Sequence, residues 1–133
     1  MPVAALDHVN IVSSNLARTI AFYERLLGLT QFDHPMFDRP DPVAAWLCDG
    51  AGRPILHVQE YDSTKHDRHT PVAPPTTGSI DHIAFRGKDL EATRATLKSH
   101  GLKFRENEVP GGRIHQIFVP DPDGILIELN FRS

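Results

Sequence analysis

Short stretches of alternating apolar and polar residues begin two similar parts of the chain. Over residues 8–11, Val9 and Ile11 fall on one face of an extended strand and the residues between them on the other. The same alternation returns over residues 82–85. Each stretch therefore predicts a β-strand with one apolar face.

A helical pattern follows each of these strands. Residues 16–28 place apolar side chains at helical spacing, after the N-capping residue Asn15 and before Gly28, which favours the end of a helix. Residues 90–101 repeat the pattern after Asp89, with a weaker apolar stripe. We therefore expect two helices of about three turns each.

The pattern then returns to short strands in both parts of the chain. These strands are expected at residues 30–34, 43–48 and 54–61, and again at 102–107, 114–119 and 125–131. The turn-forming residues 120–124 predict a tight hairpin between the last two strands, because proline is pre-set for a turn and Gly124 can adopt positive φ.

The two parts are copies of one unit. Residues 6–32 resemble residues 80–104, with Leu-Asp-His-Val at the start of the first copy and Ile-Asp-His-Ile at the start of the second. The sequence therefore predicts an α+β protein of two tandem βαβββ modules, at about 4–61 and 80–133, within a single domain spanning residues 1–133.

Two segments rich in proline interrupt this pattern. Residues 62–79 hold three prolines and almost no apolar residue, which predicts a surface linker between the modules. Residues 34–42 are rich in Pro and Asp and predict a loop beside the second and third strands.

Composition narrows the possible partners. The 133 residues carry a net charge of −3, which argues against nucleic acid as a partner. No apolar run approaches the roughly 20 residues needed to cross a bilayer, and residues 1–7 do not resemble a secretory signal. The single Cys48 cannot form an internal disulfide and is expected to be a small buried hydrophobe. We therefore expect a cytoplasmic protein that binds neither nucleic acid nor membrane.

Eight histidines in so short a chain raise the question of whether some of them converge. His8 and His82 recur at the same point of the two copies, on the strand face opposite the apolar one, and Glu128 lies on that face of the last strand. A pseudo-twofold axis between the copies would bring these three side chains together. Two imidazoles and a carboxylate with open positions form a site for a divalent transition metal.

His57 is a fourth candidate ligand. It lies in the last strand of the first module, where Glu128 lies in the second. The alternative is that His57 donates an outer-shell hydrogen bond, or that Gln59 on the same strand face takes its place. Four other histidines, at 34, 66, 69 and 100, fall in expected loops or at a helix end, which favours solvated side chains.

Several other side chains fall on the face that carries the candidate ligands and would border a substrate pocket. They are Asn10, Arg86, Gln116, Phe118 and Asn130, with Trp46 as a possible addition.

Three segments of the chain resemble those of a known family. Residues 7–29, 81–104 and 118–131, taken in this order, are similar to the vicinal oxygen chelate superfamily, which includes glyoxalase I, extradiol dioxygenases and bleomycin resistance proteins. The resemblance covers nearly the whole chain. It implies two βαβββ modules whose sheets curl around a divalent metal ion (Zn, Ni, Fe or Mn), with His8, His82 and Glu128 matching the family's ligands and His57 matching its fourth-strand position.

The chain departs from the glyoxalase I pattern at His57, where those enzymes usually carry Glu. One carboxylate and up to three neutral histidines leave a divalent ion with a net charge near +1, which favours an anionic or chelating oxygen ligand. Glu128, or water activated by the metal, would then have to act as the catalytic base.

The resemblance leaves three functions open. The first is a metal-dependent enzyme that binds two vicinal oxygens of a small substrate and performs glyoxalase-like lyase or isomerase chemistry. The second is an Fe(II) extradiol-type dioxygenase, and the third is a protein that binds a drug or metabolite without chemistry. Each module also presents one open sheet edge and an incomplete barrel, which predicts a homodimer.

Overall fold

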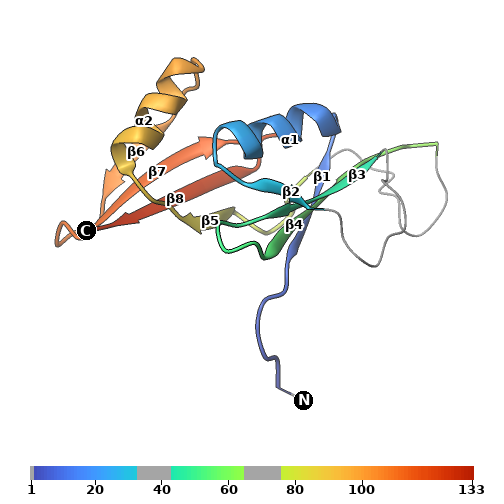
Figure 1. Cartoon of the computed structure of the whole chain (residues 1–133), viewed down its shortest axis with the longest axis horizontal. Coiled ribbons are helices and arrows are strands. Elements are labelled where there is room, and N and C mark those ends of the chain that lie inside the picture. Colours follow the sequence, from blue (N-terminus) through green and yellow to red (C-terminus); the bar gives the residue numbers. More distant parts are fainter. Residues whose placement is uncertain (1, 33–42, 65–75) are drawn as a thin grey trace. The chain divides into compact units, whose positions relative to one another are not determined.

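The computed structural model describes residues 2–32, 43–64 and 76–133 and divides the chain into two compact units, residues 1–75 and 76–133 (Figure 1). The expected loop at 34–42 and most of the expected linker, with His34, His66 and His69, lie outside the described residues. The first unit contains, in chain order, β1 (Val9–Ser13), α1 (Leu16–Arg25), β2 (Thr30–Phe32), β3 (Ala44–Cys48) and β4 (Pro54–Glu60). The second contains β5 (His82–Arg86), α2 (Leu90–Ser99), β6 (Arg105–Glu108), β7 (Ile114–Pro120) and β8 (Leu126–Arg132).

Both units have the same topology, as the internal duplication predicts. The strand order is β1-β4-β3-β2 in the first sheet and β5-β8-β7-β6 in the second. In each sheet the first and last strands of the unit pair in parallel, and the other neighbours are antiparallel. The prediction of an α+β protein with two βαβββ modules is therefore confirmed.

Each helix begins at the residue that the sequence predicts. The side chain of Asn15 accepts a hydrogen bond from the backbone N–H of Arg18 at 3.0 Å, and Asp89 caps α2 by accepting from Ala92 at 3.0 Å. These bonds satisfy donors that the first turn of a helix leaves without a partner.

The expected sixth strand begins three residues later than predicted. Gly101 adopts φ 67°, and the backbone N–H of Leu102 donates to the carbonyl of Leu97 at 3.1 Å, which closes the end of α2. Because this closure uses the Leu102 N–H, the strand does not begin at that residue, and pairing with β7 starts at Arg105. His8, expected within the first strand, immediately precedes β1.

The core of each unit lies on the face of the sheet that carries its apolar side chains. In the first unit α1 contacts β4, and the buried side chains include Phe22, Tyr23, Leu56 and Val58. In the second unit the buried apolar side chains are Leu97, Ile117, Val119, Ile125, Ile127, Leu129 and Phe131. Burial on this face leaves the opposite face of each sheet to polar side chains.

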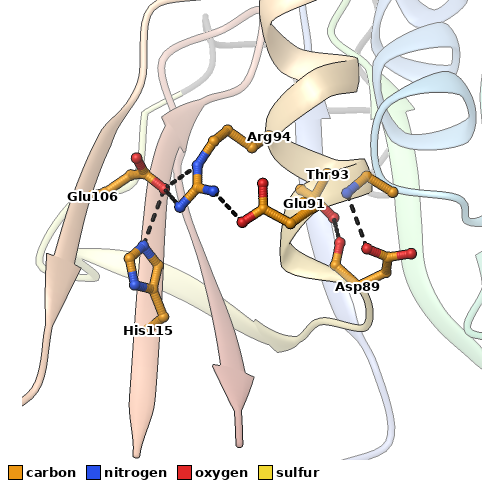
Figure 2. Close-up of polar contacts among 7 residues, drawn as sticks. Asp89, Glu91, Thr93, Arg94, Glu106 and His115 are labelled. Carbon is orange, nitrogen blue, oxygen red and sulfur yellow. Dashed lines mark hydrogen bonds and ion pairs between the residues drawn. The ribbon is translucent and has the colours of Figure 1, made fainter. Parts of the chain in front are cut away.

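A cluster of charged side chains also links α2 to its sheet (Figure 2). Arg94 of α2 donates from Nε to Glu106 Oε1 of β6 at 2.9 Å, and its Nη2 forms an ion pair with the same oxygen at 2.8 Å. Nε2 of His115 in β7 lies 3.0 Å from the same oxygen, and Glu91 lies 2.6 Å from Arg94 Nη1. Because Leu97 is the one fully buried side chain of α2, these polar contacts supplement its apolar packing.

Two further expectations concern the burial of Cys48 and the absence of a membrane-spanning segment. Cys48 is buried, as predicted, and burial raises the pKa of its thiol, with a smaller effect from the charge of Asp49. Over the described residues, no helix is long and apolar enough to span a bilayer.

Candidate functional site

The strand register shows that His57 and Glu128 occupy equivalent positions. In the first unit Asn10 of β1 pairs with His57 of β4, and in the second Ala84 of β5 pairs with Glu128 of β8. Asn10 and Ala84 each lie two residues beyond the aligned histidines of the duplication. In each unit, therefore, one histidine lies immediately before the first strand or at its start. A second candidate ligand lies on the last strand of the unit.

In the second unit the structure brings His82 and Glu128 together. Nε2 of His82 lies 3.8 Å from Oε1 of Glu128. Two side chains that bind one zinc-like ion at 2.0–2.2 Å can have their ligand atoms no farther apart than about 4.4 Å. The observed distance is therefore compatible with a shared ion.

Asp81 orients the ring of His82. Its Oδ2 lies 2.8 Å from Nδ1 of His82, so in the neutral ring Nδ1 carries the proton and Nε2 keeps its lone pair toward Glu128. The hydrogen bond to Asp81 raises the pKa of His82 above its ordinary value; burial opposes this shift and the charge of Glu128 adds to it. The arrangement is the carboxylate–histidine pair that commonly supports a metal ligand.

The same pair recurs in the first unit. Nδ1 of His8 contacts the carboxylate of Asp7, which again leaves Nε2 as the ligand atom. The His8 ring also packs edge-on against Trp46, with ring centroids 4.6 Å apart, and lies 6.4 Å from the ring of His57.

His57 has a different environment from His8 and His82. Its ring stacks on Trp46 with centroids 4.3 Å apart and an interplanar angle of 4°. The side-chain amide of Asn10 donates to Nδ1 of His57 at 2.9 Å and to Oε1 of Gln59 at 2.8 Å. With Nδ1 accepting, the proton of the neutral ring is on Nε2.

Amide side chains surround Glu128. Oε1 of Glu128 accepts from Gln116 at 3.3 Å, and Oε2 accepts from Asn130 at 2.9 Å. The Glu128 side chain is 13% exposed, so these donors compensate a carboxylate that is largely removed from water.

The other predicted pocket residues of the second unit flank this carboxylate. Phe118 lies directly across from Glu128 in the β7–β8 register. The guanidinium carbon of Arg105 lies over the Phe118 ring, 4.3 Å from the ring centroid. Arg86 lies at the end of β5, opposite Asn130. No ion pair to Arg86 occurs within the described part of the chain.

The structure thus brings the sequence-predicted ligands together in two pairs, His8 near His57 and His82 near Glu128. Neither unit, over its described residues, gathers three His, Cys, Asp or Glu side chains into one metal-binding group. The convergence of the two pairs on one ion stays a prediction.

Sequence reasoning missed three groups at these sites. Asp7 and Asp81 hold the histidines, and Asn107 donates to Gln116 at 2.8 Å. The sequence does carry a signal for the two aspartates, because each precedes a histidine at the same point of the duplication. It carries no signal for Asn107, because the position of Asn107 opposite Gln116 follows from the β6–β7 register.

Comparisons with known proteins agree with this architecture. The profile of the Glyoxalase/Bleomycin resistance protein/Dioxygenase superfamily matches residues 5–129. The chain is 30% identical to Virulence protein STM3117 of Salmonella typhimurium, over 98% of this chain and 85% of that protein. It is 25% identical to Glyoxylase I 4 of Arabidopsis thaliana, over 96% of this chain and 70% of that protein.

A solved structure supports the fold. The lactoylglutathione lyase of Agrobacterium tumefaciens superposes with a TM-score of 0.70, at 17% identity, over 98% of this chain and 96% of that one. The profile match spans both βαβββ units, from the first strand to the middle of the last. The chain therefore belongs to the Glyoxalase/Bleomycin resistance protein/Dioxygenase superfamily.

Proposed function

We propose that the chain is a metal-dependent enzyme that binds a small substrate through two vicinal oxygens and performs lyase or isomerase chemistry of the glyoxalase type. The observation that carries the proposal is the repeated Asp–His pair, in which each aspartate contacts Nδ1 and leaves Nε2 as the ligand atom. In both copies the aspartate fixes the tautomer that leaves the Nε2 lone pair available, as outer-shell carboxylates do for histidine metal ligands.

The donor set fits a divalent transition metal. His8, His82 and Glu128 would supply two imidazole nitrogens and one carboxylate oxygen, with His57 as a fourth ligand or an outer-shell donor. When bound, the ion would act as a Lewis acid and stabilise negative charge that develops on the substrate oxygens. The expected metal is Zn, Ni, Fe or Mn.

The side chains around the proposed ligands have their own roles in the proposal. Glu128, or water activated by the metal, would accept the proton removed beside the substrate carbonyl. Arg86 would bind an anionic part of the substrate, and Asn10 would orient His57. Trp46 and Phe118 would form apolar walls that limit the access of water.

Metal analysis and titration test the proposal. Protein purified without added metal should contain one ion per chain, and Co²⁺ should bind the metal-free protein with the same stoichiometry. His82→Ala should abolish tight binding, and Glu128→Gln should weaken it strongly. His100→Ala is the matched control, because His100 is exposed at the end of α2 and bonds to the carbonyl of Thr96. Binding that His82→Ala leaves intact would refute the metal site.

The reaction class is tested on the metal-loaded protein. Exchange of the hydrogen beside the carbonyl of 2-hydroxy ketones or 2-oxo acids with D₂O, followed by NMR, should depend on Glu128. Specific binding of such compounds with no exchange and no turnover would instead identify a binding protein and overturn the enzyme proposal.

An Fe(II) extradiol-type dioxygenase is the second candidate. It is favoured by the hydrogen bond that Asn10 donates to Nδ1 of His57, because that tautomer places the proton on Nε2 and leaves two histidines and one carboxylate as the ligand set. Cleavage of catechol by the Fe(II)-loaded protein would select this candidate over the first.

We also propose that the protein is a homodimer. Each four-stranded sheet ends in two edge strands, β1 and β2 in one unit and β5 and β6 in the other, and exposed edges favour pairing with another chain. Sedimentation should give about twice the chain mass of 14.8 kDa. A single species at the chain mass at micromolar concentration would refute the dimer.

A further inference from the structure

We propose that Gln116 and Asn130 are positioning residues that hold Glu128 in the orientation required of a metal ligand, and that Asn107 in turn orients Gln116. These three amide side chains, Asn107, Gln116 and Asn130, are called the amide row below. The inference rests on the proposed function, because it concerns how one proposed ligand of that site is held.

The amide row follows the register of the second sheet. Asn107 of β6 pairs with Gln116 of β7, and Gln116 pairs with Asn130 of β8. Directly opposed residues on neighbouring strands point to the same face, so the three amides cross the sheet side by side. Glu128 lies two residues before Asn130 on β8 and therefore shares that face.

The carboxylate determines the direction of every hydrogen bond in the row. An ionised Glu128 can only accept, so Gln116 and Asn130 must each present an amide nitrogen to it. Gln116 Nε2 donates to Glu128 Oε1 at 3.3 Å and to Asn130 Oδ1 at 3.0 Å, and Asn130 Nδ2 donates to Glu128 Oε2 at 2.9 Å. The Oε1 atom of Gln116 is then left to accept from Asn107 Nδ2, at 2.8 Å.

These bonds fix the carboxylate toward His82. Each oxygen of Glu128 receives one amide donor, and Oε1, the oxygen bound by Gln116, is the one that lies 3.8 Å from Nε2 of His82. A glutamate side chain otherwise has several accessible rotamers, and binding a metal would have to order it. The amide row removes that cost before the metal binds.

The first unit shows that the amide row is not a general property of the βαβββ module. The residue pair Ala44 and Gln59 holds the register position that Gln116 and Asn130 hold in the second unit. Ala44 has no side-chain donor, and the last-strand site there is His57, not a carboxylate. The row is therefore present where a carboxylate has to be held and interrupted where there is none.

Gln116 and Asn130, which the sequence predicts to border a substrate pocket, have a different role in this proposal, because their amides bind Glu128. Both hydrogens of the Gln116 amide are used, one by Glu128 and one by Asn130. Gln116 thus acts on the substrate through Glu128, and its substitution should change metal binding first.

The test compares Co²⁺ affinity in variants of the full chain. Gln116→Met keeps the length of the side chain and removes both donors, and Asn130→Ala removes the donor to Oε2. Each should weaken Co²⁺ binding by about 10- to 100-fold, as loss of an outer-shell partner does in other metal sites. The visible absorption of bound Co²⁺ should also change, because the carboxylate is no longer held in one orientation.

The matched control is Gln31→Met. Gln31 lies on β2 of the first unit, where its amide donates to Glu24 at 3.1 Å, so the variant makes the same chemical change away from Glu128. Its Co²⁺ affinity and spectrum should equal those of the wild type. Thermal unfolding of all metal-free variants separates a loss of stability from a loss of affinity.

The outcomes distinguish this inference from the proposed function. If the wild type binds Co²⁺, His82→Ala abolishes binding, and both Gln116→Met and Asn130→Ala bind like the wild type, the positioning role is overturned and the metal site stands. If Gln116→Met lowers the melting temperature but not the Co²⁺ affinity, the row is structural and the inference is also overturned. If the wild type binds no Co²⁺ specifically, the proposed function fails, and this inference fails with it.

Discussion

Replacing Glu106 by glutamine should destabilise the second unit at neutral pH but not at acid pH. Glu106 Oε1 accepts a hydrogen bond from Nε of Arg94, and it lies 2.8 Å from Nη2 of the same guanidinium and 3.0 Å from Nε2 of His115 (Figure 2). Glutamine can still accept hydrogen bonds through its amide oxygen but carries no charge. The variant therefore removes the charge-assisted part of these bonds and keeps the shape of the side chain.

The magnitude follows from the geometry and exposure of the cluster. A charge-assisted hydrogen bond is roughly twice as strong as a neutral one, while the 31% exposure of the Glu106 side chain lets solvent screen part of the difference. We expect Glu106→Gln to lower the free energy of unfolding by about 1 kcal/mol at pH 7. For a chain of this length that corresponds to roughly 3 to 5 °C in the melting temperature.

The sign of the pH dependence follows from the pKa of Glu106. Its hydrogen bond with Arg94 lowers the pKa below the ordinary value, burial opposes this shift, and the contact with His115 adds to it. A carboxyl whose pKa is lower in the folded state stabilises the fold above its unfolded pKa of about 4.3, and this contribution disappears as the pH falls through the folded pKa. The difference between wild type and variant should therefore be constant near pH 7 and shrink toward zero below about pH 4.

Thermal unfolding followed by circular dichroism at pH 7 and pH 3 checks this prediction. Glu91→Gln is the matched control, because Glu91 contacts the same guanidinium but is 79% exposed and should contribute only a few tenths of a kcal/mol. An equal loss for Glu106→Gln at both pH values would refute the electrostatic explanation. So would an equal loss for the two variants at pH 7.

Three further predictions concern the second unit and the proposed site. Gly87→Ala should lower the free energy of unfolding by about 1–3 kcal/mol in thermal melts, because a Cβ atom there would overlap the buried Phe131 ring. Adding Phe131→Leu to this variant should recover part of the loss. Arg86→Gln should weaken binding of oxalate to the Co²⁺-loaded protein by about tenfold in calorimetry without changing Co²⁺ affinity, since a charged partner is lost; unchanged oxalate affinity would contradict an anion-binding role. His57→Glu should raise hemithioacetal isomerase activity from negligible to measurable, because it restores a second carboxylate at the position equivalent to Glu128; wild-type turnover at ordinary enzyme rates would contradict this reasoning.

The sequence by itself determined the architecture and the candidate ligands. The duplicated strand and helix pattern predicted two βαβββ modules, and the topology of both sheets confirms them. The same duplication singled out His8 and His82, and strand alternation placed Glu128 on the polar face of β8. The inference about the fold succeeded because helical and strand periodicities are local properties, which a single sequence carries in full, whereas the ligand role of these three residues stays a prediction.

Only the tertiary structure decided which side chains meet across strands. The β1–β4 register placed Asn10 beside His57, and the β6–β7 register placed Asn107 beside Gln116. The charged cluster between α2 and its sheet was likewise absent from the sequence prediction, because Arg94 and His115 meet only through Glu106. Strand register depends on turns and hydrogen bonds over the whole sheet, and a shift of one residue turns every side chain to the other face. Contacts of this kind are therefore decided by the assembled sheet and not by the local pattern of residues.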